Sequence, residues 1–222
     1  MRTLTRTLLV GAAAMLTLTA CSDGTDTATT PSASATATSF PQSAKYIADM
    51  PAADGKTMTI GIAVDGDQVA AYACNGVDDE AWFFGDQTDG SIDIAGKFRD
   101  TLSASIDGAD VVGDLTMNGV AYRFTAAPVP APAGMYTGAA DGVRATWVVR
   151  PGDSATGVQH SPGAKPADDP NLLSDDDFRD QVRNARTLEP ASPILSLQNG
   201  TGTADINGQV VTLQVVDGDF RL

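Results

Sequence analysis

Short runs in which apolar and polar residues alternate fill the chain from Lys45 onward, and Asp-Gly or Asn-Gly pairs separate them. A period of two puts alternate side chains on opposite faces, as in a strand with one face on a core. Asp-Gly and Asn-Gly pairs tolerate the positive φ angles of tight hairpin turns. The pattern therefore predicts a mainly all-β domain, an antiparallel meander of roughly 10–12 short strands in a barrel- or sandwich-like arrangement.

One stretch, near 174–188, breaks this pattern and predicts a helix. Ser174 is a favourable N-cap with an acid three residues later, and Pro190 would stop the helix. Arg183 and Arg186 suit the negative C-terminal end of the helix dipole. A narrow apolar stripe would dock the helix on a sheet, and it consists of Phe178, Val182 and Ala185.

Two parts of the chain resemble each other in sequence. GDLTMNGVAYRFT, from Gly113, aligns with GTADINGQVVTLQ, from Gly202, and Tyr46 and Tyr136 precede Asp-Gly pairs at nearly the same offset. Matching offsets predict two related half-units within one continuous domain, although hairpins that share Asn-Gly turns also align by chance. The domain would span 44–222 and its half-units about 45–129 and 135–222.

The amino terminus has the pattern of an export signal. Arg2 and Arg6 form a positive segment, and an apolar run of 13 residues extends from Leu8 to Ala20. A membrane-spanning helix needs about 20 apolar residues, so this run is too short to cross with charged flanks. The polar sequence after Cys21 offers nothing to bury, which also disfavours a core helix.

The segment LTAC that ends at Cys21 resembles the lipobox at the end of the signal peptide in bacterial lipoprotein precursors. The resemblance implies cleavage between Ala20 and Cys21 and acylation of the Cys21 thiol. Residues 1–20 would then be a signal peptide, and 21–43 a disordered tether rich in Ser, Thr and Ala. We expect a lipid anchor on the extracytoplasmic face of the cell membrane, with the membrane as a partner.

The chain is acidic, with a formal net charge of −14. Such a surface repels nucleic acid and has no electrostatic attraction to anionic lipid, so we expect no nucleic-acid partner. The chain has two cysteines, and a modified Cys21 would leave Cys74 without a disulfide partner. Because Cys74 lies in the apolar run VAAYAC, we expect an inert buried thiol rather than a nucleophile.

Candidate catalytic and metal-binding residues are few. His160, the only histidine, lies in a polar stretch, where we expect a surface residue rather than a member of a catalytic triad. The sequence has no Gly-x-Ser-x-Gly elbow and no His/Cys spacing typical of zinc sites. We therefore predict no catalytic residue, no metal and no cofactor, and a protein that is not an enzyme.

The segment NGVDDEAWFFG is the one place where acids adjoin aromatic residues. Its aromatic side chains point to both faces of the predicted strand, which indicates either a central covered strand or one exposed patch. The acids before it belong either to a hairpin loop or to a hydrolytic carboxylate pair. The candidate ligand or partner surface comprises Asp78, Asp79, Glu80, Trp82, Phe83, Phe84 and, from the second half, Trp147.

The succession of VAAYACNGVDDEAWFFG, DGSIDIAGK and VVGDLTMNGVAYRFTA resembles uncharacterised exported proteins and lipoproteins of actinobacteria, over about Tyr46 to Val158. The resemblance implies a fold and no activity. We predict a lipid-anchored cell-envelope protein whose β-domain is a non-enzymatic binding or structural module for an unknown envelope ligand or protein partner. Two alternatives stay open, a carrier of an apolar envelope ligand such as a lipid, and a carboxylate-based hydrolase.

Overall fold

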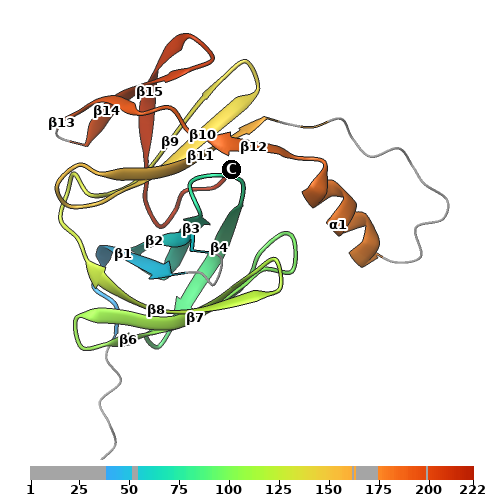
Figure 1. The fold of residues 1–222 in the computed structure, drawn as a ribbon. Helices are drawn as coiled ribbons and strands as arrows, with labels where there is room; N and C mark the ends of the chain where they lie inside the picture. The colour runs from blue at the N-terminus through green and yellow to red at the C-terminus, as the bar shows by residue number, and fades with distance from the viewer. Residues whose placement is uncertain (1–38, 52–54, 162, 164–174, 199) are drawn as a thin grey trace, which may run out of the picture. The chain divides into compact units, whose positions relative to one another are not determined.

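The structure is a computed structural model (Figure 1). It describes residues 39–51, 55–161, 163, 175–198 and 200–222. Within these ranges, no helix combines the length and the apolar character that a membrane span requires. The expected cleavage and lipidation residues, Ala20 and Cys21, lie outside the described residues, as does nearly all of the predicted tether.

The first eight strands close into an antiparallel barrel, in which each strand pairs with the next and β8 returns to β1. Tyr46 of β1 lies opposite Pro128 of β8 in that closing pair. The strands of the barrel are β1 (Ser43–Pro51), β2 (Thr57–Asp65), β3 (Gln68–Cys74), β4 (Glu80–Thr88), β5 (Ser91–Ala95), β6 (Thr101–Asp107), β7 (Asp110–Met117) and β8 (Val120–Pro128).

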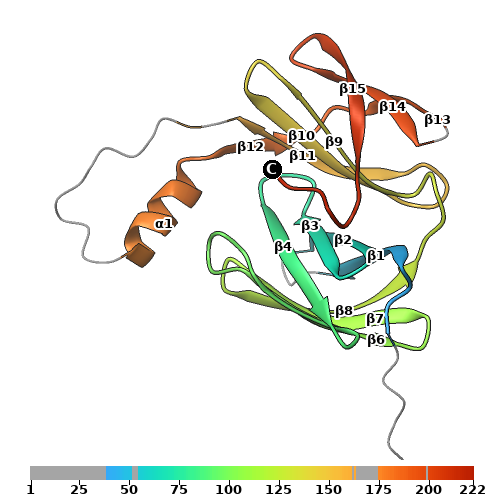
Figure 2. The ribbon, with the colours of Figure 1, turned by 180° about the vertical axis from the view of Figure 1, so that it is seen from behind.

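The other seven strands form a second antiparallel sheet, in the order β12-β11-β10-β9-β15-β14-β13. The last strand returns to the first, so that Val215 of β15 lies opposite Tyr136 of β9. In Figures 1 and 2 this sheet lies on one side of the barrel. Its strands are β9 (Gly134–Ala140), β10 (Val143–Val149), β11 (Ala155–Ser161), β12 (Thr187–Pro190), β13 (Ile194–Gln198), β14 (Thr201–Ile206) and β15 (Gln209–Val216).

The single helix of the described residues, α1 (Asp175–Asn184), lies between β11 and β12. It confirms a helix near 174–188, but the helix ends earlier than predicted. Residues 187–190 form β12 instead, where Leu188 lies opposite His160 of β11. Strand pairing with β11 therefore replaces the last turn that the sequence pattern assigned to the helix.

These features confirm the prediction of a mainly all-β antiparallel fold, in which the first eight strands form a closed barrel. The described residues contain 15 strands rather than roughly 10–12. The additional ones include β12 and β13, whose sequences TLEP and ILSLQ are too short to show a clear alternation. Backbone pairing with β11 and β14 makes them strands despite this weak pattern.

The interior of the barrel is filled by apolar side chains. Tyr46, Phe83 and Leu102, which come from β1, β4 and β6, are each almost fully buried there. Burial of a large apolar side chain stabilises a fold by about 1.5–3 kcal/mol. The closed barrel is therefore a packed core rather than an open channel.

A second apolar cluster joins the outer face of the barrel to the second sheet. Strands β2 and β3 are consequently buried on both faces, which explains their nearly continuous apolar sequences. Gly61 of β2 permits the close approach, because a Cβ there would lie 2.5 Å from Cγ of Met135. Cys74 belongs to this cluster, fully buried and without a disulfide. Burial raises the pKa of its thiol to about 12 and confirms an inert buried cysteine.

The second sheet has a smaller core of its own, centred on Trp147 of β10. Trp147 is 2% exposed, and its indole Nε1 donates a hydrogen bond of 2.9 Å to the carbonyl oxygen of Ser192. Gly157 lies opposite it on β11, and a Cβ there would approach Cδ1 of Trp147 to 2.7 Å. A large indole and a glycine thus fit together across two neighbouring strands.

Candidate ligand site at the rim of the barrel

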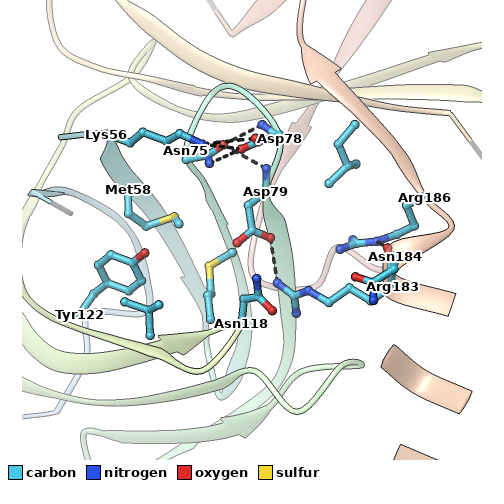
Figure 3. A pocket seen from close by; sticks show the side chains of 13 residues that line it. Lys56, Met58, Asn75, Asp78, Asp79, Asn118, Tyr122, Arg183, Asn184 and Arg186 are labelled. Atoms are coloured by element: carbon cyan, nitrogen blue, oxygen red, sulfur yellow. Dashed lines mark hydrogen bonds and ion pairs between the residues drawn. The ribbon is translucent and has the colours of Figure 1, made fainter. Parts of the chain in front are cut away.

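A cavity of about 410 Å³ lies at one end of the barrel, between the strand turns and the C-terminal end of α1 (Figure 3). The barrel side is formed by the start of β2, the β3–β4 turn and the β7–β8 hairpin. The opposite side is formed by Arg183 and Asn184 of α1, and by Arg186 and Leu188 just after it. Residues that lie far apart in the sequence therefore share one cavity.

The β3–β4 turn is held in shape by the side chain of Asn75. Its Oδ1 accepts hydrogen bonds of 2.9–3.0 Å from the backbone N–H groups of Val77, Asp78 and Asp79. Its Nδ2 donates to Oδ1 of Asp78 at 2.7 Å, and Nζ of Lys56 also contacts that carboxylate at 3.1 Å. This network presents the two neighbouring aspartates to the cavity in fixed positions.

Arg183 connects the helix to the barrel through a buried ion pair. Its Nη1 donates to both carboxylate oxygens of Asp100 at 2.7 Å, and its Nη2 donates to Oδ1 of Asp79 at 2.8 Å. Asp100, which is 2% exposed, also accepts the backbone N–H of Asn118 at 3.0 Å. Burial raises the pKa of the Asp79 carboxyl, and the nearby Arg183 guanidinium opposes that rise.

Polar contacts also connect the rest of α1 to the barrel. Nη2 of Arg99 donates to both carboxylate oxygens of Asp180 at 2.8–2.9 Å. Phe178, in contrast, is 44% exposed. The prediction that an apolar stripe docks the helix was therefore wrong for this residue, and the buried contact of α1 with the barrel is made by Arg183.

Three side chains that line the cavity retain hydrogen-bonding capacity. The amides of Asn118 and Asn184 make no side-chain hydrogen bond with any described residue. Arg186 donates from Nε to the carbonyl oxygen of Arg183 at 3.1 Å and from Nη1 to that of Glu80 at 3.4 Å. Within the described ranges, Arg186 has no carboxylate at ion-pair distance. Groups of this kind are what a polar ligand requires.

The three acids of the candidate surface each bind a different cation. Asp78 pairs with Lys56, and Asp79 pairs with Arg183. Glu80 points away from them into the join between the sheets, where Arg144 Nη2 donates to its Oε1 at 2.6 Å. Asp78 and Asp79 line the cavity, whereas Glu80 does not.

Glu80 belongs to a separate buried polar group between the barrel and the second sheet. Its Oε2, the hydroxyl of Tyr72, the indole Nε1 of Trp82 and the Nε of Arg144 have no hydrogen-bond partner among the described residues. Burial raises the pKa of the Glu80 carboxyl, and Arg144 opposes that rise. Neighbouring His160 is half-buried in β11 rather than on the surface, and burial lowers its pKa to about 4.

The four aromatic residues of the candidate surface lie in three different places. Phe83 lies inside the barrel, and Trp147 lies in the core of the second sheet. Trp82 and Phe84 stack on each other on the outer face of β4, with ring centroids 5.3 Å apart, and Phe220 packs against both rings. The structure therefore does not bring the four residues together around one cavity.

Sequence reasoning missed the residues that complete the rim cavity. The sequence pattern explains Arg183 and Arg186 by the helix dipole, and it explains Asn118, in the pair Asn118-Gly119, by a hairpin turn. Asp100 and Asn184 carried no signal, because each lies in an ordinary polar stretch. The ion pair between Arg183 and Asp100 spans 83 residues of sequence, and no local pattern encodes it.

The described residues contain no group of three or more His, Cys, Asp or Glu side chains that could hold a metal ion. The cavity instead combines amides, cations and carboxylates with apolar side chains such as Met58 and Met117. Comparisons of the chain with protein-family models, with curated proteins and with solved structures found no match. The residues of the site therefore provide the basis for a functional proposal.

Proposed function

We propose that the protein is a lipid-anchored, non-enzymatic binding module on the extracytoplasmic face of the cell membrane, and that the rim cavity binds its ligand. The observation that carries the proposal is the set of unused hydrogen-bonding groups in that cavity. The amides of Asn118 and Asn184 and part of the Arg186 guanidinium have no partner among the described residues. Asn118 and Asn184 are exposed, so a ligand would take the place of water at their amides.

The size and the lining of the cavity favour a small polar ligand. Ligand sites commonly occupy about 300–1,000 Å³ and combine apolar walls with a few polar groups that orient the ligand. The rim cavity has about 410 Å³, with Met58, Met117 and Leu188 beside the polar groups. Hydrogen bonds of Asn75 and Arg183 fix its walls, so little order has to be gained on binding.

The apolar carrier is less well supported. A lipid needs a continuous apolar cavity, whereas Phe83 and Leu102 are among the side chains that fill the barrel interior. Trp147 lies in a different core from Phe83. The rim cavity itself is lined by several charged residues, which would lose water without compensation if an acyl chain entered.

The carboxylate-based hydrolase also lacks the geometry that it needs. Such enzymes place two carboxyl groups across one substrate bond, one of them protonated and one ionised. Asp78 and Asp79 are each held by a cation, and Glu80 points to the join between the sheets. These ion pairs favour a structural role for the acids at the rim and support a binding module.

Membrane attachment rests on the lipobox pattern at Cys21. We predict that Cys21→Ala abolishes acylation, so that the precursor stays uncleaved or the protein appears in the medium. Membrane fractionation and intact-mass analysis would measure both outcomes. A matched Cys74→Ala variant should stay attached, because Cys74 is buried in the fold. Normal processing and attachment of Cys21→Ala would contradict the lipid anchor.

Native mass spectrometry of the full chain, released gently from the membrane of its own host, tests ligand binding. We expect the wild type to retain a small polar molecule, Asn184→Ala to lose most of it, and Gln214→Ala to keep it. Gln214 is a suitable control because its exposed amide lies on β15, away from the residues that line the cavity. A retained lipid, or equal retention by Asn184→Ala and wild type, would contradict the proposed site.

A further inference from the structure

We propose that the ligand of the rim cavity carries a compact anionic group, a carboxylate or a phosphate, and that Arg186 is the residue that binds it. This inference rests on the proposed function, because it specifies the ligand of the same cavity. It starts from the charges that line the site. Three cations contribute to the lining, Lys56, Arg183 and Arg186.

Two of these cations already have carboxylate partners. Lys56 Nζ lies 3.1 Å from Asp78, and Arg183 is paired with both Asp79 and Asp100. Arg186 differs, because its two protein acceptors are neutral backbone carbonyl groups. The nearby Glu80 carboxylate is already bound by Arg144. Within the described part of the chain, the Arg186 charge is therefore the one at this cavity that lacks an anionic partner.

The environment of Arg186 makes this unpaired charge costly. Its side chain is half-buried, and burial lowers the pKa of the guanidinium. Partly desolvated charges are stabilised by a nearby opposite charge. The carboxylates of Glu80, Asp79 and Asp100 oppose this lowering through longer-range attraction, and a bound anion would add a direct partner.

The guanidinium is also held in one orientation. Its centre lies 4.7 Å from the centroid of the Phe98 ring, and the two backbone hydrogen bonds engage Nε and Nη1. Its Nη2 has no acceptor among the described residues, and Figure 3 shows the side chain among those that surround the cavity. An oriented guanidinium binds carboxylate and phosphate oxygens through charge-assisted hydrogen bonds.

The opposite wall limits how much negative charge the ligand can carry. Asp78 and Asp79 lie on the barrel side, where a second anionic group would be repelled. The amides of Asn118 and Asn184 both donate and accept hydrogen bonds, which suits hydroxyl groups. The geometry therefore fits a ligand with one anionic group on a hydroxylated body.

Four related probes test the anionic group. Isothermal titration calorimetry of the full chain in detergent, at constant ionic strength, would compare glucose, glucuronate, glucose 6-phosphate and inorganic phosphate. We expect glucuronate or glucose 6-phosphate to bind about tenfold or more tightly than glucose. Preference for glucuronate would assign a carboxylate ligand, and preference for glucose 6-phosphate together with inorganic phosphate would assign a phosphate ligand.

Variants connect this preference to Arg186. Arg186→Gln should reduce the preference to about the level of glucose, and Arg186→Lys should retain part of it, since it keeps the charge but not the planar donor group. Arg123→Gln is the matched control, because Arg123 lies on the barrel wall with 87% of its side chain exposed. Circular dichroism would verify that all three variants fold.

The outcomes separate this inference from the proposed function. Failure of both anionic sugars to bind more tightly than glucose, or an unchanged preference in Arg186→Gln, would overturn the anionic ligand. If glucose still binds in that case and Asn184→Ala weakens its binding, the proposal that the cavity is a polar binding site still holds. The native mass measurement on Asn184→Ala tests the binding site without any assumption about charge.

Discussion

The closed barrel and the second sheet follow the same order of strands, yet one closes and the other does not. In the barrel, β1 pairs with both β2 and the last strand, β8. In the second sheet, β9 likewise pairs with β10 and with the last strand, β15. The position that β5 occupies in the barrel has no counterpart among the described residues, and the second sheet is open there, between β12 and β13.

The hairpins that the sequence comparison aligned occupy equivalent positions in this order. Asn118-Gly119 joins β7 to β8, and Asn207-Gly208 joins β14 to β15, with positive φ at all four residues. Related half-units would give such an arrangement. Whether the halves are related stays a prediction, because a shared strand order also arises from repeated antiparallel hairpins.

The difference between the halves produces the candidate site. A turn that includes Asn75 joins β3 to β4, whereas the segment that includes α1 joins β11 to β12. The C-terminal end of α1 contributes Arg183 and Asn184 to the rim of the barrel. The second half therefore supplies one wall of a cavity whose other walls come from the first half.

Removal of one large core side chain from each half has the largest expected effect. Phe83→Ala in the barrel and Trp147→Ala in the second sheet should each lower the free energy of unfolding by about 3–5 kcal/mol. Both residues are almost fully buried, in separate clusters. Urea unfolding would measure the losses. Where an alanine variant does not accumulate, Phe83→Leu and Trp147→Phe should give smaller losses of the same sign.

The same variants test whether the halves are stable independently. The apolar cluster between the sheets buries Tyr72 and Met135, so we expect a single unfolding transition for both variants. Hydrogen exchange should show β3 and β10 opening together. Two separate transitions, each sensitive to only one of the substitutions, would contradict this coupling.

Loss of the ion pair between α1 and the barrel should have the next largest effect. Arg183→Ala leaves the Asp100 carboxylate buried without its cation, and such a change commonly costs about 3–5 kcal/mol. Asp180→Ala is the matched control, because its pair with Arg99 is half-exposed and should contribute at most about 1 kcal/mol. Urea unfolding would compare them, and equal losses would contradict a special role for the buried pair.

The local features of the fold were predictable from sequence. Asp-Gly and Asn-Gly pairs predict the turns because these residue types tolerate positive φ, as the structure shows at Asn118 and Asn207. The existence of one helix also followed from its capping residues. Neither pattern contains information on which distant strands meet, so the pairing of β1 with β8 and of β15 with β9 could not be predicted.

The candidate site was predictable only in part. The acids Asp78 and Asp79 stood out beside aromatic residues, and both line the cavity. Their partners did not stand out, because the ion pair of Arg183 with Asp79 forms only after the two halves pack together. Trp82 stood out in the sequence, but its environment could not be predicted, since its neighbour Phe220 comes from the far end of the chain. A strand with aromatic residues on both faces is compatible with burial and with exposure.

A pH titration should show a moderate change in folding stability that arises from His160, in the second half of the chain. Because the pKa of His160 is lowered to about 4 in the fold, the unfolded chain takes up a proton there first on acidification. The contribution of His160 to stability is therefore present above its ordinary value near 6.5 and is lost as the pH falls towards 4. Melting temperatures between pH 7 and pH 4 would measure this dependence.

His160→Gln is the informative variant in that titration. The raised pKa values of Asp79 and Glu80 act in the opposite direction, since their contribution is present at low pH and is lost as the pH rises through their folded values. Both acids are unchanged in the variant, so the difference between the two pH profiles isolates the histidine. Parallel profiles from pH 7 to pH 4 would show that His160 is not buried as neutral imidazole.

Substitutions in the equivalent turns of the two halves should change stability only slightly and should give the clearest contrast in function. Alanine at Asn118 or Asn207 should cost about 1–2 kcal/mol, because both residues have positive φ. Asn207 also accepts a hydrogen bond from Nε2 of Gln159 at 3.2 Å, so its loss should be the larger of the two. Only Asn118 lines the cavity, and therefore only Asn118→Ala should weaken ligand binding. Calorimetry would measure ligand binding by both variants, and urea unfolding would measure their stability. Equal binding by the two variants would show that Asn118 does not contact the ligand.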